Sequence, residues 1–385
     1  MKSLELRKKF FDFFVRHGHE KVASSSLIPA GDPTLLFTNA GMNQFKDVFL
    51  GSEKRSYKRA VSVQKCVRAG GKHNDLENVG FTQRHLTFFE MMGNFSFGDY
   101  FKKEAISYAW DFLTKEIGLN PQELYVTVHH SDQESYDIWH ESMHIPKEKI
   151  FKLGESNFWQ MGDVGPCGPC TEIFVDRGPK VGCGSKECSP ACDCDRFLEV
   201  WNNVFMQFNR QADGTDVLLK QTGVDTGMGL ERLALIVQKK ESVFETDAFQ
   251  SIFEKIEQLT GHSYKNGSDE IRAAFNVLGD HIRSSTLLIS DGCAPSNDGR
   301  GYVLRKIIRR AALFAQKLTD KNIFPELSLV LVDDMKSVYP DLALNKDRIA
   351  SVLQLEIERF SDNLVRGKRI LQDYMREQKS SKLIC

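Results

Sequence analysis

Apolar residues recur at helical spacing near the start of the chain. Leu6, Phe10 and Phe13 follow one another at intervals of four and three residues, which predicts an amphipathic helix that Gly18 ends. The same period returns later in the chain and predicts helices over the following segments: 105–113, 249–256, 271–282 and 303–314. Successive helices therefore dominate the last third of the sequence.

The middle of the chain has a different pattern. Polar and apolar residues mix over 61–68 and 84–91, and the polar, glycine-bearing segment between them predicts the loop of a long antiparallel hairpin. Segment 157–190 is rich in Gly, Pro and Cys, so we expect loops there. The aromatic and β-branched run 197–208 predicts a buried strand.

A change of pattern marks a domain boundary near residue 243. A strand should end near Asp225, a helix should open at Gly229, and only helical spacing follows. We therefore expect two domains, 1–243 and 244–385, in a chain too long for one core.

Charge and cysteine content limit the possible environments. The 51 Lys and Arg nearly cancel the 52 Asp and Glu, so any RNA-binding surface must be local. No segment resembles a signal peptide or reaches the roughly 20 apolar residues that span a bilayer, so we expect a cytoplasmic protein with no membrane partner. Nine cysteines, six of them within 167–194, favour a metal site over a disulfide framework.

Four of these cysteines could form a structural zinc site. Their thiolates fall within twelve residues, which is enough for one tetrahedral ion. The spacing is not that of a standard zinc finger, so the site stays a hypothesis. The candidate ligands are Cys183, Cys188, Cys192 and Cys194.

Two other short motifs carry alternative chemistry. Cys167 and Cys170 have the spacing of a redox pair. His140 and His144 satisfy the His-Glu-x-x-His pattern of zinc proteases, but no third ligand is evident downstream. We expect both histidines to be surface residues.

Two arginines are candidates for binding a nucleotide. Arg68 closes the first predicted hairpin strand, and Arg232 ends a Gly-Met-Gly-Leu-Glu-Arg turn whose glycines allow close backbone approach. Phosphates need such fixed cations. Gly70-Gly71-Lys72 is followed by His73, so it is not a Walker loop, and ATP must be held differently.

Four longer segments, which correspond to three motifs, resemble the alanyl family of class II aminoacyl-tRNA synthetases. Segments 68–80 and 87–101 resemble motif two, 32–45 the motif one region, and 224–232 motif three. The resemblance runs from about Leu6 to at least Arg310. It implies an α+β fold with an antiparallel sheet flanked by helices, followed by an all-helical domain.

The resemblance also implies roles in the active site. Arg68 would bind the ATP α-phosphate, Arg232 adenine or the phosphates, and Asp225 the alanine ammonium group. Trp159 would form a wall, and Gly229 would leave room for ATP. Contacts to both ATP and alanine would come from Val200, Trp201 and Asn202. The Cys167–Cys170 segment would be backbone of an active-site loop.

One position departs from the family pattern. Leu86 stands where alanyl enzymes commonly have a histidine, which removes one candidate for ATP contact. Strand alternation would place Leu86, Phe88 and Glu90 on one face, with Phe88 stacking on adenine and Glu90 making a polar contact. Phe89 would then point the other way.

The helical region resembles the element with which the family approaches the tRNA acceptor stem. Asn297 could recognise a G·U pair through its groove edge, and the arginines of the following basic amphipathic helix, Arg305 and Arg309 among them, would bind phosphates. A solvated helix face is the alternative explanation of that charge.

The resemblance implies an alanine–tRNA ligase that uses ATP, Mg²⁺ and alanine and charges tRNA(Ala). A paralogue that serves another acceptor and a non-catalytic RNA-binding protein remain alternatives. The family's editing and C-terminal domains are not recognised here, and a helix still runs at Cys385. We therefore expect an N-terminal, monomeric fragment with a shortened helical domain.

Overall fold

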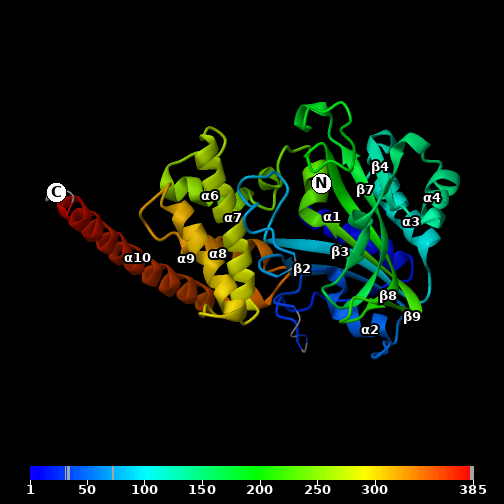
Figure 1. Ribbon diagram of the computed structural model, residues 1–385, viewed down its shortest axis with the longest axis horizontal. Coiled ribbons are helices and arrows are strands. Elements are labelled where there is room, and N and C mark those ends of the chain that lie inside the picture. Colours follow the sequence, from blue (N-terminus) through cyan, green and yellow to red (C-terminus); the bar gives the residue numbers. More distant parts are fainter. Residues whose placement is uncertain (31, 33–34, 72, 382–385) are drawn as a thin grey trace. The chain divides into compact units, whose positions relative to one another are not determined.

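The computed structural model describes residues 1–30, 32, 35–71 and 73–381. Pro33 and Thr34 of the motif one region and Lys72 of motif two lie outside this range. The chain divides into two compact units, Met1–Gln250 and Ser251–Cys385 (Figure 1). The first holds the strands and the second consists of helices.

The first unit is built on a mixed sheet, nine-stranded over the described residues. The order β1-β2-β3-β9-β8-β7-β4-β5 is antiparallel except that β1 pairs with β2, and β4 with β5, in parallel, and β6 is added beside β7. The strands are β1 (Glu20–Lys21), β2 (Arg59–Val67), β3 (Phe88–Phe97), β4 (Leu124–His129), β5 (Ile150–Leu153), β6 (Phe158–Gln160), β7 (Gly165–Asp176), β8 (Phe197–Arg210) and β9 (Asp216–Gly229).

The predicted hairpin is present with a different second boundary. β2 pairs antiparallel with β3, with Val67 opposite Phe88. The second strand begins at Phe88, four residues later than predicted, because residues 84–87 still belong to the connecting loop. β9 extends past Asp225 to Gly229, where α5 (Leu230–Val237) follows directly.

The prediction of loops over 157–190 was wrong for half of that segment. β6 and β7 occupy it, and Cys167 and Cys170 lie in β7 rather than in a loop. A Cβ atom added at Gly168 would lie 2.0 Å from the Phe205 carbonyl oxygen, so glycine permits the close approach of β7 and β8. A register shift between Cys167 and Cys170 accommodates this irregular stretch.

Helices cover the sheet where its strands carry apolar side chains. α1 (Ser3–Arg16) packs Phe10 and Phe14 against Trp201 of β8, at centroid distances of 6.0 and 6.3 Å. Glu5 accepts a 2.9 Å hydrogen bond from the Lys2 amide at the start of α1. The remaining helices of this unit are α2 (Lys46–Leu50), α3 (Lys102–Asp111) and α4 (Gln133–Asp137).

Strand alternation separates two faces of the sheet. Phe95 and Phe97 of β3 pack with Phe45 and Phe49, which lie in and beside α2, in one core cluster. Residues of the opposite parity, such as Phe88, are buried on the other face. The β3 residues that border the pocket described below, Phe89 and Met91, share the parity of Phe95.

The second unit is a group of five helices in the described part of the chain. They are α6 (Gln250–Thr260), α7 (Asp269–Ser290), α8 (Gly299–Ala315), α9 (Phe324–Met335) and α10 (Asp341–Ser381). The Ser268 hydroxyl caps α7 by accepting from the Ile271 amide at 3.3 Å. α7 is buried over most of its length and packs against α8, α9 and α10. Among the described residues, no helix is long and apolar enough to cross a membrane.

Candidate active site

A pocket of about 260 Å³ opens on the α2 face of the sheet. Its lining comes from β3, β6, β7, β8 and β9 and from the loop that joins β2 to β3. The residues predicted from the sequence that line it are Arg68, Leu86, Trp159, Val200, Asn202, Asp225, Gly229 and Arg232. The fold thus brings together residues that are far apart in the sequence: Arg68 and Arg232 are separated by 164 positions along the chain.

The two predicted arginines enter this pocket from different elements. Arg68 follows β2, and its guanidinium lies 5.2 Å from the centroid of the Phe89 ring. Its Nε also donates to the Asn39 carbonyl at 3.3 Å. Arg232 lies in the first turn of α5, where its Nη1 pairs with Glu199 Oε2 at 2.9 Å. Two fixed cations therefore border one cavity, as phosphate binding requires.

Asp225 is a buried carboxylic acid that faces the pocket with a free oxygen. Its exposed fraction is 4%, and Oδ1 accepts no hydrogen bond from the described residues. Burial raises the pKa of Asp225 well above its ordinary value. Asn202 Oδ1 is likewise without a donor among the residues described. Asp225 Oδ1 and Asn202 Oδ1 are therefore both able to accept hydrogen bonds from an ammonium group.

Two carboxylates in the pocket were missed by sequence reasoning. Glu172 of β7 accepts from Asn202 Nδ2 at 3.2 Å, and Glu199 of β8 pairs with Arg232. Burial, and then the charge of Glu199, raise the pKa of Glu172 well above its usual range. Alternation along β7 could have found Glu172, but only once 165–176 was recognised as a strand. Glu199 has the parity of Trp201, and it lines the pocket because a register shift between Ile173 and Phe174 interrupts the alternation.

The predicted orientation of the β3 side chains needs correction. Because β3 begins at Phe88, alternation does not extend back to Leu86. Leu86 and Phe89 line the pocket, whereas Phe88 is fully buried on the opposite face. Glu90 is on that face too, where it forms a buried ion pair with Arg7 of α1. Phe89, not Phe88, is therefore placed to contact a base.

The three residues predicted to contact both ligands are divided by the same alternation. Val200 and Asn202 line the pocket. Trp201 between them is fully buried in the helical core, 5.6 Å from the Phe112 ring centroid. Trp201 does not line the pocket, since it faces the side of the sheet opposite to that of its neighbour Asn202. Trp159 of β6 is half-buried and lines the pocket.

The candidate zinc ligands lie close together in the loop before β8. The Sγ atoms of Cys183, Cys188 and Cys192 all lie within 4.8 Å of one another, and Cys188 Sγ is 3.6 Å from Cys194 Sγ. Zn–S bonds of about 2.3 Å place neighbouring sulfurs of a tetrahedral site about 3.8 Å apart. Cys183, Cys188 and Cys192 therefore cluster as ligands of one ion would, whereas Cys194 is placed beside them only by its distance to Cys188.

The other two motifs are explained by the fold. Cys167 and Cys170 are buried in β7, and burial raises the pKa of Cys167 to about 11 and that of Cys170 well above its usual value. Both stay protonated thiols, which argues against redox chemistry. His140 Nδ1 bonds to the Ile145 carbonyl at 3.0 Å, and His144 has a left-handed backbone, φ 57°, so the two histidines do not share a helix face.

The predicted tRNA contacts lie at the start of α8 in the second unit. Asn297 is exposed and accepts from Arg305 Nη1. Arg305 and Arg309 share Glu356 of α10, at 3.1 and 2.9 Å. This glutamate is 3% exposed, so it holds both guanidiniums at fixed positions and offsets part of their charge.

Comparison with known proteins gives a family and close relatives. Residues 5–385 match the family model of the tRNA synthetases class II (A). An alanine–tRNA ligase of Bdellovibrio bacteriovorus is 52% identical over 99% of this chain and 43% of its own length. Those of Pseudomonas savastanoi pv. phaseolicola and Hydrogenovibrio crunogenus are 54% and 53% identical, over 99% and 97% of this chain and 44% and 43% of theirs. The chain thus spans less than half the length of these relatives.

Proposed function

Because the chain belongs to the tRNA synthetases of class II (A), we propose that it activates alanine with ATP and transfers it to the 3′ end of tRNA(Ala). The observation that carries this proposal is the buried Asp225, whose free oxygen faces a cavity also bordered by Arg68 and Arg232. A carboxylate for an ammonium group and two arginines for phosphates are the groups that adenylate formation needs.

In the first step, an alanine carboxylate oxygen attacks the α-phosphorus of ATP and the bond to pyrophosphate breaks. Asp225 binds the alanine ammonium group and so aims the carboxylate at the phosphate. Arg68 stabilises the negative charge that grows on the α-phosphate, and Phe89 offers its ring to adenine. Arg232, which also lines the pocket, binds adenine or the phosphates.

In the second step, the terminal ribose hydroxyl of tRNA attacks the alanyl carbonyl carbon and AMP leaves. No covalent intermediate with the protein is required. Glu172 and Glu199 both line the pocket. Their carboxylate oxygens fit Mg²⁺, which prefers such ligands. When bound, Mg²⁺ would offset the charge of the ATP phosphates. Asn297, Arg305 and Arg309 would bind the acceptor stem.

Alanine-dependent exchange between ATP and pyrophosphate tests this function. We expect alanine to be the best substrate, with glycine and serine weaker, because one methyl group gives only about 1–3 kcal/mol of discrimination. Exchange driven best by another amino acid would contradict the assignment. Exchange without transfer to any tRNA would favour a paralogue with another acceptor, and a folded protein that binds no ATP would favour an RNA-binding role.

We further propose that Cys183, Cys188, Cys192 and Cys194 bind one structural zinc ion. The clustered sulfurs of Cys183, Cys188 and Cys192 and the contact of Cys194 with Cys188 support it, and residues 183–194 contain no helix or strand. Metal analysis after dialysis should give one zinc per chain, and changing all four residues to serine should remove it. A full zinc equivalent in that variant would rule the cluster out.

A further inference from the structure

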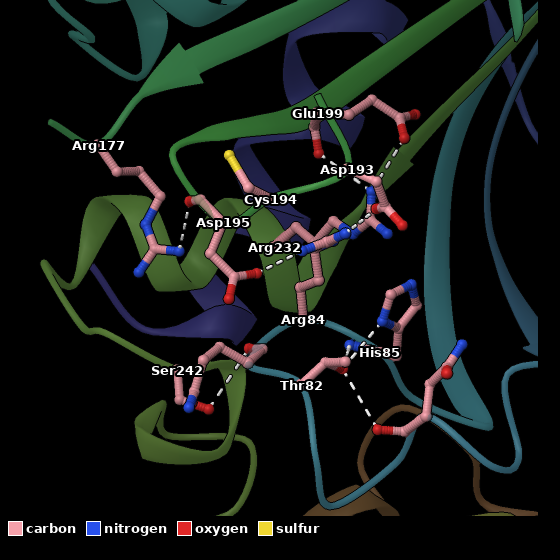
Figure 2. A network of polar contacts seen from close by, with 12 residues as sticks. Thr82, Arg84, His85, Arg177, Asp193, Cys194, Asp195, Glu199, Arg232 and Ser242 are labelled. Carbon is pink, nitrogen blue, oxygen red and sulfur yellow. Dashed lines mark hydrogen bonds and ion pairs between the residues drawn. The ribbon is translucent and has the colours of Figure 1, made fainter. Parts of the chain in front are cut away.

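Two arginines that line the pocket, Arg84 and Arg232, form ion pairs with carboxylates of one short segment, 193–199. Arg84 pairs through Nη1 with Asp195 and through Nη2 with Asp193. Arg232 pairs with Glu199 at 2.9 Å. Figure 2 shows Arg84 between the two aspartates, beside the Arg232–Glu199 pair. Both arginines line the nucleotide pocket.

Arg84 is held unusually firmly for a residue of a long loop. Its side chain is 13% exposed, and two carboxylates bind separate nitrogens of one planar guanidinium. The Asp193 side chain is 95% exposed, so the position of its carboxylate depends mainly on the backbone of its own loop. The orientation of Arg84 therefore depends on the conformation of the cysteine loop.

The aspartates alternate with two candidate zinc ligands in the sequence Cys192-Asp193-Cys194-Asp195. The Cys194 amide donates to the Cys192 carbonyl at 2.9 Å, and Cys194 Sγ lies 3.6 Å from Cys188 Sγ. On the far side, Arg177 Nη1 donates to the Asp195 carbonyl at 3.0 Å. An ion bound by these thiols would fix the backbone that carries both aspartates.

We propose that Arg84 is a positioning link between the zinc cluster and the nucleotide site. With the ion bound, Asp193 and Asp195 hold the Arg84 guanidinium at the wall of the pocket, ready for the phosphates of ATP. This inference rests on the proposed function. Coupling between two binding sites is reciprocal, so ATP should tighten zinc binding by the same factor by which zinc tightens ATP binding.

The experiment measures zinc affinity by competition with a chromophoric chelator, with and without saturating ATP and Mg²⁺. We expect ATP to tighten zinc binding about tenfold, within the usual range of such coupling. Arg84→Ala should still bind one zinc but lose the effect of ATP, and Asp195→Asn should reduce it. Arg84→Lys should also reduce it, because lysine cannot bridge two carboxylates with a planar fork.

Asp99→Asn is the matched control, since it breaks an ion pair with Arg59 that lies outside the pocket. It should leave the coupling unchanged. Calorimetry of ATP binding to the same protein distinguishes failure of the proposed function from failure of the link through Arg84. If ATP does not bind, the proposed function fails. If ATP binds but leaves zinc affinity unchanged or weakened, or if the full effect persists in Arg84→Ala, the link through Arg84 is overturned.

Discussion

The buried carboxyl group of Asp225 lowers the stability of the protein when no ligand is bound. Its pKa is raised by burial, so the folded state holds the proton to a higher pH than the unfolded chain does. Stability is therefore lost as pH rises above the unfolded value. Asp225→Asn removes this loss, and we expect its Tm to exceed that of the parent by about 2–4 °C near pH 8, or about 1 kcal/mol. Thermal unfolding from pH 4 to 8 should show the difference shrink towards pH 4.

The same substitution should remove the contact to the alanine ammonium group. Losing a charge-assisted hydrogen bond costs about 1.5–3 kcal/mol, so the Kd for alanine should rise about 10- to 150-fold. ATP binding should change little. Arg68→Ala is the matched variant and should weaken ATP far more than alanine. Equal losses of both ligands in both variants would contradict the two roles.

Phe88 and Phe89 are adjacent residues with opposite surroundings, and they form a second matched pair. Phe89→Leu removes the ring beside Arg68, and we expect the KM for ATP to rise about 3- to 10-fold, which corresponds to the energy of one aromatic or cation–π contact. Phe88→Leu should lower stability by about 1 kcal/mol with no change in KM. Steady-state exchange kinetics and thermal unfolding distinguish the two. A larger KM effect from Phe88→Leu would restore the original assignment.

At the scale of elements, the sequence predicted α1, α6, α7 and α8 because each has a clear helical period of apolar residues, and it predicted β8 from its aromatic and β-branched run. It did not predict β7. Glycine and proline in Gly165–Pro169 usually indicate a loop, but the contact of Gly168 with the Phe205 carbonyl shows that the strand needs them. The spacing of apolar residues in a sequence does not show where two strands pack closely, so it could not predict β7. Phe88 and Phe89 were assigned to the wrong faces, because alternation alone does not say which face of β3 borders the pocket. Trp201 was grouped with Val200 and Asn202 by resemblance, although alternation within the predicted strand 197–208 separates it from them.

Gly168→Ala tests this explanation of β7. The added Cβ would clash with backbone, so β7 and β8 must separate, and we expect a loss of about 1–3 kcal/mol of stability together with weaker ATP binding. Gly367→Ala is the control, because a Cβ there meets nothing within 4 Å and the residue lies inside helix α10. It should be neutral or slightly stabilising. Equal stability of both variants would show that close packing is not the reason for Gly168.

At the scale of the molecule, the pocket residues all belong to the unit Met1–Gln250. We therefore expect residues 1–250, produced alone, to fold and to retain alanine-dependent exchange within a few-fold. Charging of tRNA should be lost, because phosphate contacts supply much of the binding free energy and the proposed ones lie on α8. Exchange and aminoacylation assays on the same preparation measure both. Asn297→Ala in the whole chain should lower charging and leave exchange unchanged.

The four tryptophans of the chain differ in position, so the intrinsic tryptophan fluorescence of the protein can report ligand binding. Trp139 and Trp201 are fully buried, Trp110 lies 5.8 Å from Trp139, and Trp159 is the one of the four that lines the pocket. Ligand entry should therefore alter the emission of a single fluorophore against a constant background. Trp159→Phe should abolish this spectral response. Stopped-flow fluorescence could then time nucleotide and amino-acid arrival without a label.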